Sequence, residues 1–133
     1  MKTIARLAFV GVGVMAMFLS RATAETPYEV WSIDQSNSPG KTFGGTVYIH
    51  DGKDLERVHG AANAAPEMID LGLEASALCL AQTGANPVRP HMIAVNASQS
   101  HAIISFVATG HVLIMDARTR TPIECIRTSA GAG

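Results

Sequence analysis

The 133-residue sequence has few charged side chains, few aromatic ones and very little cysteine. Charged residues make up 16% and aromatic residues 5%, whereas hydrophobic residues reach 47%. That balance excludes an intrinsically disordered chain, in which charge is high and hydrophobicity is low. Lysine and arginine do not cluster anywhere, so the sequence predicts no nucleic-acid partner.

Only two cysteines occur, Cys79 and Cys125. The sequence lacks the Cys-x-x-Cys-His spacing of covalently bound haem, and no two histidines have the short spacing of a metal-binding motif. A Gly-x-Ser-x-Gly nucleophile elbow is also missing. We therefore expect no cofactor, no metal and no catalytic residue. The cysteines form either a disulfide or two buried thiols that act as small hydrophobic groups.

A long apolar run lies at the N-terminus. Basic residues precede the uncharged residues 7–19, and Ala22-Thr23-Ala24 has the small-x-small pattern that signal peptidases cleave. The sequence therefore predicts a secretory signal peptide over residues 1–24, cut between Ala24 and Glu25. An uncleaved membrane anchor is the alternative, although Arg21 interrupts the run before the roughly 20 residues that a span needs.

The remaining residues, 25–133, carry seven basic and 11 acidic side chains, a net charge of −4. No second long apolar run follows, so we expect no membrane contact after signal cleavage. The predicted localisation is periplasmic or secreted. In such an oxidising compartment a disulfide persists.

Residues 91–126 are predicted to form four strands separated by three short turns. Runs of five to seven residues rich in valine and isoleucine, between small or polar segments, are typical of an antiparallel meander. The predicted strands are residues 91–95, 101–107, 111–116 and 122–126 here, and residues 28–34, 46–50 and 67–71 upstream. Between the two groups, residues 73–82 fit either a short helix that Gly84 ends or a further strand.

The segments 45–51 and 110–116 share one pattern at a spacing of 65 residues. Both read Gly, any residue, Val, a large apolar residue, Ile, any residue, Asp. Glycine lets the chain turn into the strand, Val and Ile pack, and Asp can bond the backbone of the next turn. Such self-similarity indicates a repeat architecture.

Residues 90–126 resemble one blade of a YVTN-type β-propeller. Pro90 and Ile93-Ala94-Val95 match the opening strand, and residues 110–116 match the third strand, whereas residues 96–100 replace the usual Asp-Gly turn. The resemblance implies an all-β fold of antiparallel four-stranded blades. It divides the exported part into a partial blade at residues 28–71, an insertion or loop at 72–89 and a full blade at 90–127.

A propeller ring needs roughly four to eight blades, which is more than residues 25–133 supply. We therefore expect these residues to be the N-terminal blades of a longer chain, partnered by its remaining blades. The alternative is an open β-meander whose edges another partner covers.

The resemblance also implies that loops at one rim of the ring bind a ligand. Arg89 and His91 flank Pro90 where a loop enters a strand, and His111 begins a strand that runs in the same direction. We predict these three residues as ligand-binding. The alternatives are a structural salt bridge for Arg89 and hydrogen-bonded or exposed histidines.

The expected function is that of an exported, non-enzymatic binding or scaffold protein of the YVTN kind, with a protein or polymer ligand. The alternative is the propeller part of a periplasmic redox enzyme that depends on haem or a metal. The propeller of haem-containing nitrite reductases is similar in repeat form, and histidines hold or face the cofactor there. A truncated gene product without activity is a third interpretation.

Overall fold

The computed structural model describes residues 27–58 and 65–128. The predicted signal peptide and its cleavage site between Ala24 and Glu25 lie outside the described residues. Within these ranges the elements are β1 (Glu29–Asp34), β2 (Thr46–Asp51), α1 (Gly52–Val58), β3 (Glu67–Asp70), α2 (Glu74–Thr83), β4 (Pro90–Val95), β5 (His101–Phe106), β6 (His111–Asp116) and β7 (Pro122–Arg127).

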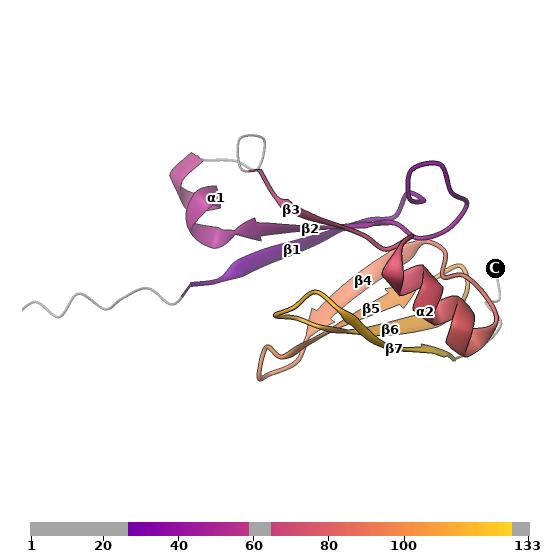
Figure 1. Cartoon of the computed structure of the whole chain (residues 1–133). Helices are drawn as coiled ribbons and strands as arrows, with labels where there is room; N and C mark the ends of the chain where they lie inside the picture. The colour runs from indigo at the N-terminus through magenta and orange to yellow at the C-terminus, as the bar shows by residue number, and fades with distance from the viewer. Residues whose placement is uncertain (1–26, 59–64, 129–133) are drawn as a thin grey trace, which may run out of the picture.

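The strands form two antiparallel sheets in sequential order (Figure 1). The first sheet has the order β1-β2-β3 and the second has the order β4-β5-β6-β7. These runs form strands because valine and isoleucine pack well on a pleated surface, and tight polar turns join most neighbours. The prediction of an antiparallel β fold that contains a four-stranded sheet is therefore confirmed.

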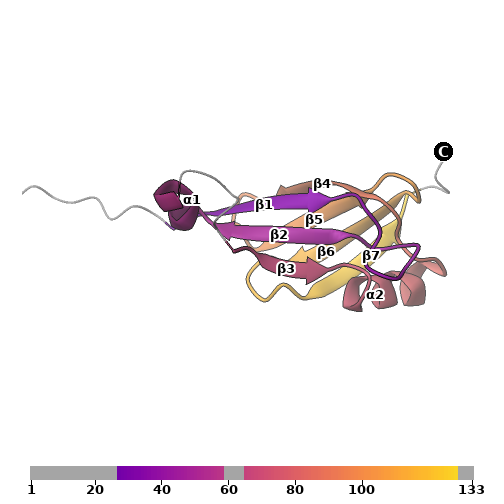
Figure 2. The same cartoon turned by 90° about the horizontal axis from the view of Figure 1, so that it is seen from above.

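The first sheet lies over one face of the second, and the hydrophobic core fills the space between them (Figures 1 and 2). Val47 and Ile49 of β2 are 0% and 4% exposed, and Leu113 and Met115 of β6 are both 0% exposed. Full burial of such a side chain stabilises the fold by about 1.5–3 kcal/mol. The two sheets thus share one core.

The repeated segments form equivalent strands, β2 and β6, that bury opposite faces. Strand β2 buries the valine and isoleucine of the pattern, whereas β6 buries the residues that alternate with them. The buried residues are Val47 and Ile49 in β2 and His111, Leu113 and Met115 in β6. The first sheet therefore contacts the second with the face that carries the Val and Ile of the repeat, and the second contacts the first with its other face. Two like sheets stacked in the same orientation meet in this way.

The glycine and the aspartate of the repeat act as the sequence predicts. Gly45 and Gly110 have φ angles of 140° and 64°, in the region that favours glycine. A Cβ on Gly45 would lie 2.3 Å from Cγ of Pro90, so only glycine fits there. Oδ1 of Asp51 accepts a hydrogen bond from the Lys53 amide at 2.8 Å, and Oδ1 of Asp116 accepts one from the Arg118 amide at 2.9 Å.

Helix α2 packs against β7 and is tied to it by a disulfide. Cys79 and Cys125 are bonded, with their Cα atoms 5.0 Å apart. The hydroxyl of Ser76 donates to the Leu71 carbonyl at 2.7 Å near the start of the helix. Gly84, with φ of 77°, ends it by donating its amide to the Leu80 carbonyl. The cysteines are therefore bridged, and this segment takes the helical alternative.

Helix α1 is a feature that the sequence did not predict, because Asp51-Gly52 is a strong turn signal. The ring of Tyr28 packs so close to Gly52 that a Cβ there would lie 2.3 Å from it. The Tyr28 hydroxyl also donates to Glu56 at 2.6 Å.

No closed ring of sheets forms within the described residues. None of the helices described is long and apolar enough to cross a membrane.

Candidate functional site

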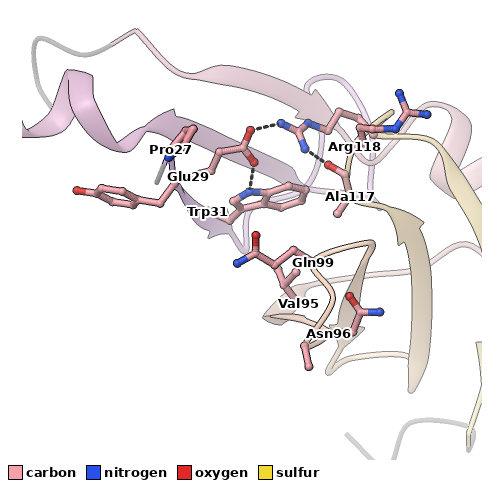
Figure 3. Close-up of a pocket in the computed structure, with 11 residues that line it drawn as sticks. Pro27, Glu29, Trp31, Val95, Asn96, Gln99, Ala117 and Arg118 are labelled. Atoms are coloured by element: carbon pink, nitrogen blue, oxygen red, sulfur yellow. Dashed lines mark hydrogen bonds and ion pairs between the residues drawn. The ribbon is translucent and has the colours of Figure 1, made fainter. Parts of the chain in front are cut away.

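A groove with a volume of about 530 Å³ opens where the start of β1 meets two turns of the second sheet (Figure 3). Trp31 lies on β1, Gln99 on the β4–β5 turn and Arg118 on the β6–β7 turn. Figure 3 shows the indole of Trp31 in the middle of the groove, with Glu29 on one side and Gln99 and Val95 on the other. The groove thus joins three segments that are far apart in the sequence.

Arg120 holds the two sheets together at one wall of this groove. Its guanidinium carbon lies 4.8 Å from the centre of the Trp31 ring. Its Nη2 is 2.6 Å from Glu29 on β1, and its Nε is 3.3 Å from Glu67 on β3. Its Nη1 donates to the carbonyl of Ala117. Only arginine presents donors in several directions from one plane that also stacks on a ring.

Glu29 links the aromatic and the charged parts of the wall. One carboxylate oxygen accepts from Arg120, and the other accepts from Nε1 of Trp31 at 2.8 Å. The hydrogen bond from Arg120 is the main cause that holds the pKa of Glu29 below its ordinary value, against the opposing effect of burial. Burial alone would lower the pKa of Arg120, but its contacts with Glu29 and Glu67 raise it above its ordinary value. Both groups therefore stay charged at neutral pH.

The opposite wall is built by the β4–β5 turn, which Asn96 stabilises. Its side-chain oxygen accepts hydrogen bonds from the amides of Ser100 and His101 at 2.8 and 3.0 Å. Gln99 has a φ of 56°, a left-handed conformation that a tight turn imposes. The Gln99 amide group is thereby presented on a fixed backbone, where it can donate and accept hydrogen bonds.

A second groove of about 290 Å³ lies on the other side of Arg120, between β3 and the start of β7. It is lined by acidic residues of the first sheet and α2, among them Glu67, Asp70 and Glu74, and by the apolar Met68 and Pro122. Arg120 lines both grooves. Its side chain is only 18% exposed, and its ion pair with Glu67 neutralises part of the acidic charge of the second groove.

The structure does not bring the three predicted ligand-binding residues together. Arg89 and His91 are exposed, whereas His111 is 1% exposed and lies inside the fold. His91 follows Pro90 at an irregularity in the β4–β5 pairing, and β5 separates β4 from β6. None of the three lines either groove. Their role in ligand binding stays a prediction.

The buried ring of His111 is fully engaged by threonines. Nδ1 lies 2.8 Å from the hydroxyl of Thr109, and Nε2 lies 2.8 Å from the hydroxyl of Thr83 on α2. Burial is the main cause that lowers the pKa of His111, and the charge of Arg127 acts in the same direction. This histidine is therefore neutral at physiological pH and links α2 to β6.

Comparison with protein-family models, with curated proteins and with solved structures found no match. Among the described residues, no group of three or more histidine, cysteine or acidic side chains is arranged to hold a metal ion. What the larger groove offers is an aromatic ring, side-chain amides and guanidinium groups on rigid turns. Such groups recognise polar ligands by stacking and hydrogen bonding.

Proposed function

We propose that this chain is an exported, non-enzymatic binding or scaffold protein of the YVTN kind, in which the two sheets are successive blades. The larger groove contacts a polar segment of a protein or polymer ligand. The observation that carries the proposal is the convergence of Trp31, Gln99 and Arg118 from three separate segments onto one groove.

The blade interpretation is supported by the way the repeat packs. Successive blades of a propeller stack face to face in the same orientation, so the front face of one sheet packs on the back face of the next. A given strand position therefore faces its neighbour from the front of one sheet, and the position beside it does so from the back of the next. Val47 and Ile49 of the first sheet pack toward the face of the second sheet that carries Leu113 and Met115. Sequential strand order within each sheet agrees with this arrangement.

The binding role is supported by the chemistry of the groove wall. A ring such as Trp31 contributes area at low cost in side-chain entropy, and Arg118 contributes donors for carbonyl, hydroxyl or carboxylate oxygens. Arg118 is exposed, in contrast to Arg120, which is committed to the two sheets. Export is supported by the signal-like N-terminus and by the Cys79–Cys125 disulfide.

The test is site-specific crosslinking in the exported fraction of the producing cells. A photo-reactive phenylalanine analogue at Gln99 should capture a protein or polymer, whereas the same group at Leu80, exposed on α2, should not. Arg118→Ala should lower the affinity of the protein for the captured ligand about tenfold, the effect of one lost charge-assisted hydrogen bond. Equal capture at both positions, or none at Gln99, would refute the proposal. A haem absorption band in the purified protein would instead favour the redox alternative.

A further inference from the structure

Two polar side chains of the larger groove are not used by the fold. Among the residues that the structure describes, the side chains of Gln99 and Arg118 make no hydrogen bond and no ion pair. By contrast, Asn96 uses its amide group within the β4–β5 turn, and Arg120 is bound to a glutamate of each outer strand of the first sheet. Gln99 and Arg118 are therefore available to a ligand.

Gln99 occupies a position at which the turn alone would favour glycine. Its φ of 56° lies in the left-handed region, which a glutamine side chain adopts at a cost in stability. Arg120 lines the same groove with a φ of 63°, and its ion pairs account for the arginine there. No such contact accounts for the glutamine. Strained residues concentrate at functional sites, so this one indicates that the Gln99 side chain is used outside the fold.

Trp31 presents a fixed aromatic surface in the middle of the groove. Its Nε1 donates to Glu29 at 2.8 Å, and the guanidinium of Arg120 lies over the ring. Figure 3 shows Gln99 and Val95 across the groove from the indole. The face of an aromatic ring is electron-rich and attracts C–H groups that carry a partial positive charge. A sugar ring offers such groups, because its carbon atoms are bonded to oxygen.

The walls of the groove carry no excess of positive charge. Arg120 is paired with Glu29 and Glu67. The charge of Arg118 acts on Asp116, the last residue of β6. A phosphate or sulfate group would need basic side chains without acidic partners. The balance of charge therefore favours an uncharged ligand that bonds through hydroxyl groups.

We infer that the larger groove binds an uncharged oligosaccharide, with Trp31 stacked on a sugar ring and with Gln99 and Arg118 bonded to its hydroxyl groups. The inference rests on the proposed function and narrows its polymer ligand to a carbohydrate. An amide and a guanidinium each present neighbouring polar atoms in one plane, which suits a pair of adjacent hydroxyl groups. The groove volume of about 530 Å³ lies in the range of small-ligand sites.

The same features disfavour a peptide as the ligand. An extended peptide binds mainly through its backbone to the edge of a sheet, whereas the free groups of this groove are side chains on two turns. A proline-rich peptide needs a row of aromatic rings. Tyr28 also lines the groove, but its hydroxyl bonds to Glu56 and its ring packs against Gly52, so it is directed to α1. Trp31 is thus the one ring held in the middle of the groove.

The test applies the exported protein to a printed array of neutral and acidic oligosaccharides. We expect retention on neutral oligosaccharides that share one sugar unit. Titration with the best-bound of them should change the fluorescence of Trp31, the only tryptophan of the sequence. Binding to acidic oligosaccharides alone would overturn the inference. So would the absence of array binding while crosslinking in the groove captures a protein, and that result would leave the proposed function standing.

Gln99→Gly separates a role in binding from a role in the fold. Glycine adopts the left-handed conformation freely, so the thermal midpoint should not fall. The affinity for the oligosaccharide should fall about tenfold, because the hydrogen bonds of the amide group are lost. Gln35→Gly is the matched control, since Gln35 is exposed beyond the other end of β1 and should leave the affinity unchanged. An unchanged affinity in Gln99→Gly would refute the role of this glutamine.

Discussion

The guanidinium carbon of Arg120 lies 4.8 Å from the centre of the Trp31 ring, although one residue follows a strand of the second sheet and the other stands in the first. Arg120 leaves the β6–β7 turn of the second sheet, and Trp31 stands on β1 of the first sheet. Glu29 bonds to both side chains, so three groups form one unit across the sheet contact.

Arg120→Gln should therefore loosen the contact between the sheets. We expect a loss of about 1–2 kcal/mol in the free energy of unfolding, because charge-assisted hydrogen bonds and a stacked cation are removed while the acidic partners are half exposed. Urea unfolding followed by Trp31 fluorescence measures it. Arg118→Gln, two residues away and exposed, is the control and should change stability by less than about 0.5 kcal/mol. Equal effects of both changes would contradict the role of Arg120.

Removal of the Cys79–Cys125 bridge should destabilise the protein by about 2–4 kcal/mol, because the bridge closes a loop over a sequence separation of 46 residues. Unfolding curves with and without a reductant measure the effect. The double variant Cys79→Ser, Cys125→Ser should start at the lower stability and show no response to reductant. A reductant effect in that variant would mean that something other than the disulfide is being changed.

The stability of the fold should fall as the pH drops below the ordinary histidine pKa of about 6.5. The pKa of His111 is lowered by burial, so the unfolded chain binds a proton that the folded chain resists. The full stability is present above the pKa of the unfolded state and is lost as the pH falls through that of the folded state. Urea unfolding at pH 7.5 and 5.5 measures the loss, and His111→Gln should reduce the difference. An unchanged pH dependence in that variant would assign the effect to other groups.

Export should produce a mature protein that begins at Glu25. Cleavage after Ala24 follows from the small residues at the end of the apolar run. Intact-mass spectrometry of the exported fraction gives the N-terminus directly. Ala24→Leu should block cleavage, while Thr23→Leu, at the tolerant middle position, should not. An exported chain that retains Met1 would instead support the uncleaved anchor.

Much of the fold could be predicted from the sequence, because most strands are local runs that contain β-branched residues and lie between turn formers. The repeat also located the equivalent strands β2 and β6. Helix α1 could not be predicted, since it depends on a contact between Tyr28 and Gly52, which are separated along the chain by a whole hairpin. Local turn chemistry at Asp51-Gly52 gives no sign of that contact.

The candidate site was harder to predict for the same reason. Arg120 and Glu29 are 91 residues apart in the sequence, and only the packing of two sheets brings them together. His111 was predicted at a rim because it begins a strand. That position places a residue at the end of the sheet, but it does not determine to which face of the sheet the side chain points. Sharp alternation of burial along β6 is what places this histidine inside. The sequence held two signals that could have pointed to the candidate site. These are the single tryptophan, Trp31, and an arginine within a polar turn, Arg120.

The opposite burial of β2 and β6 means that matching positions of the repeat tolerate substitution differently. At Val47, which is buried between the sheets, a polar side chain would lose its contact with water and destabilise the fold. At Val112, which faces outward and is half-buried, the same change leaves the side chain in contact with solvent. The same residue in the same pattern is therefore a core position in one sheet and a surface position in the other.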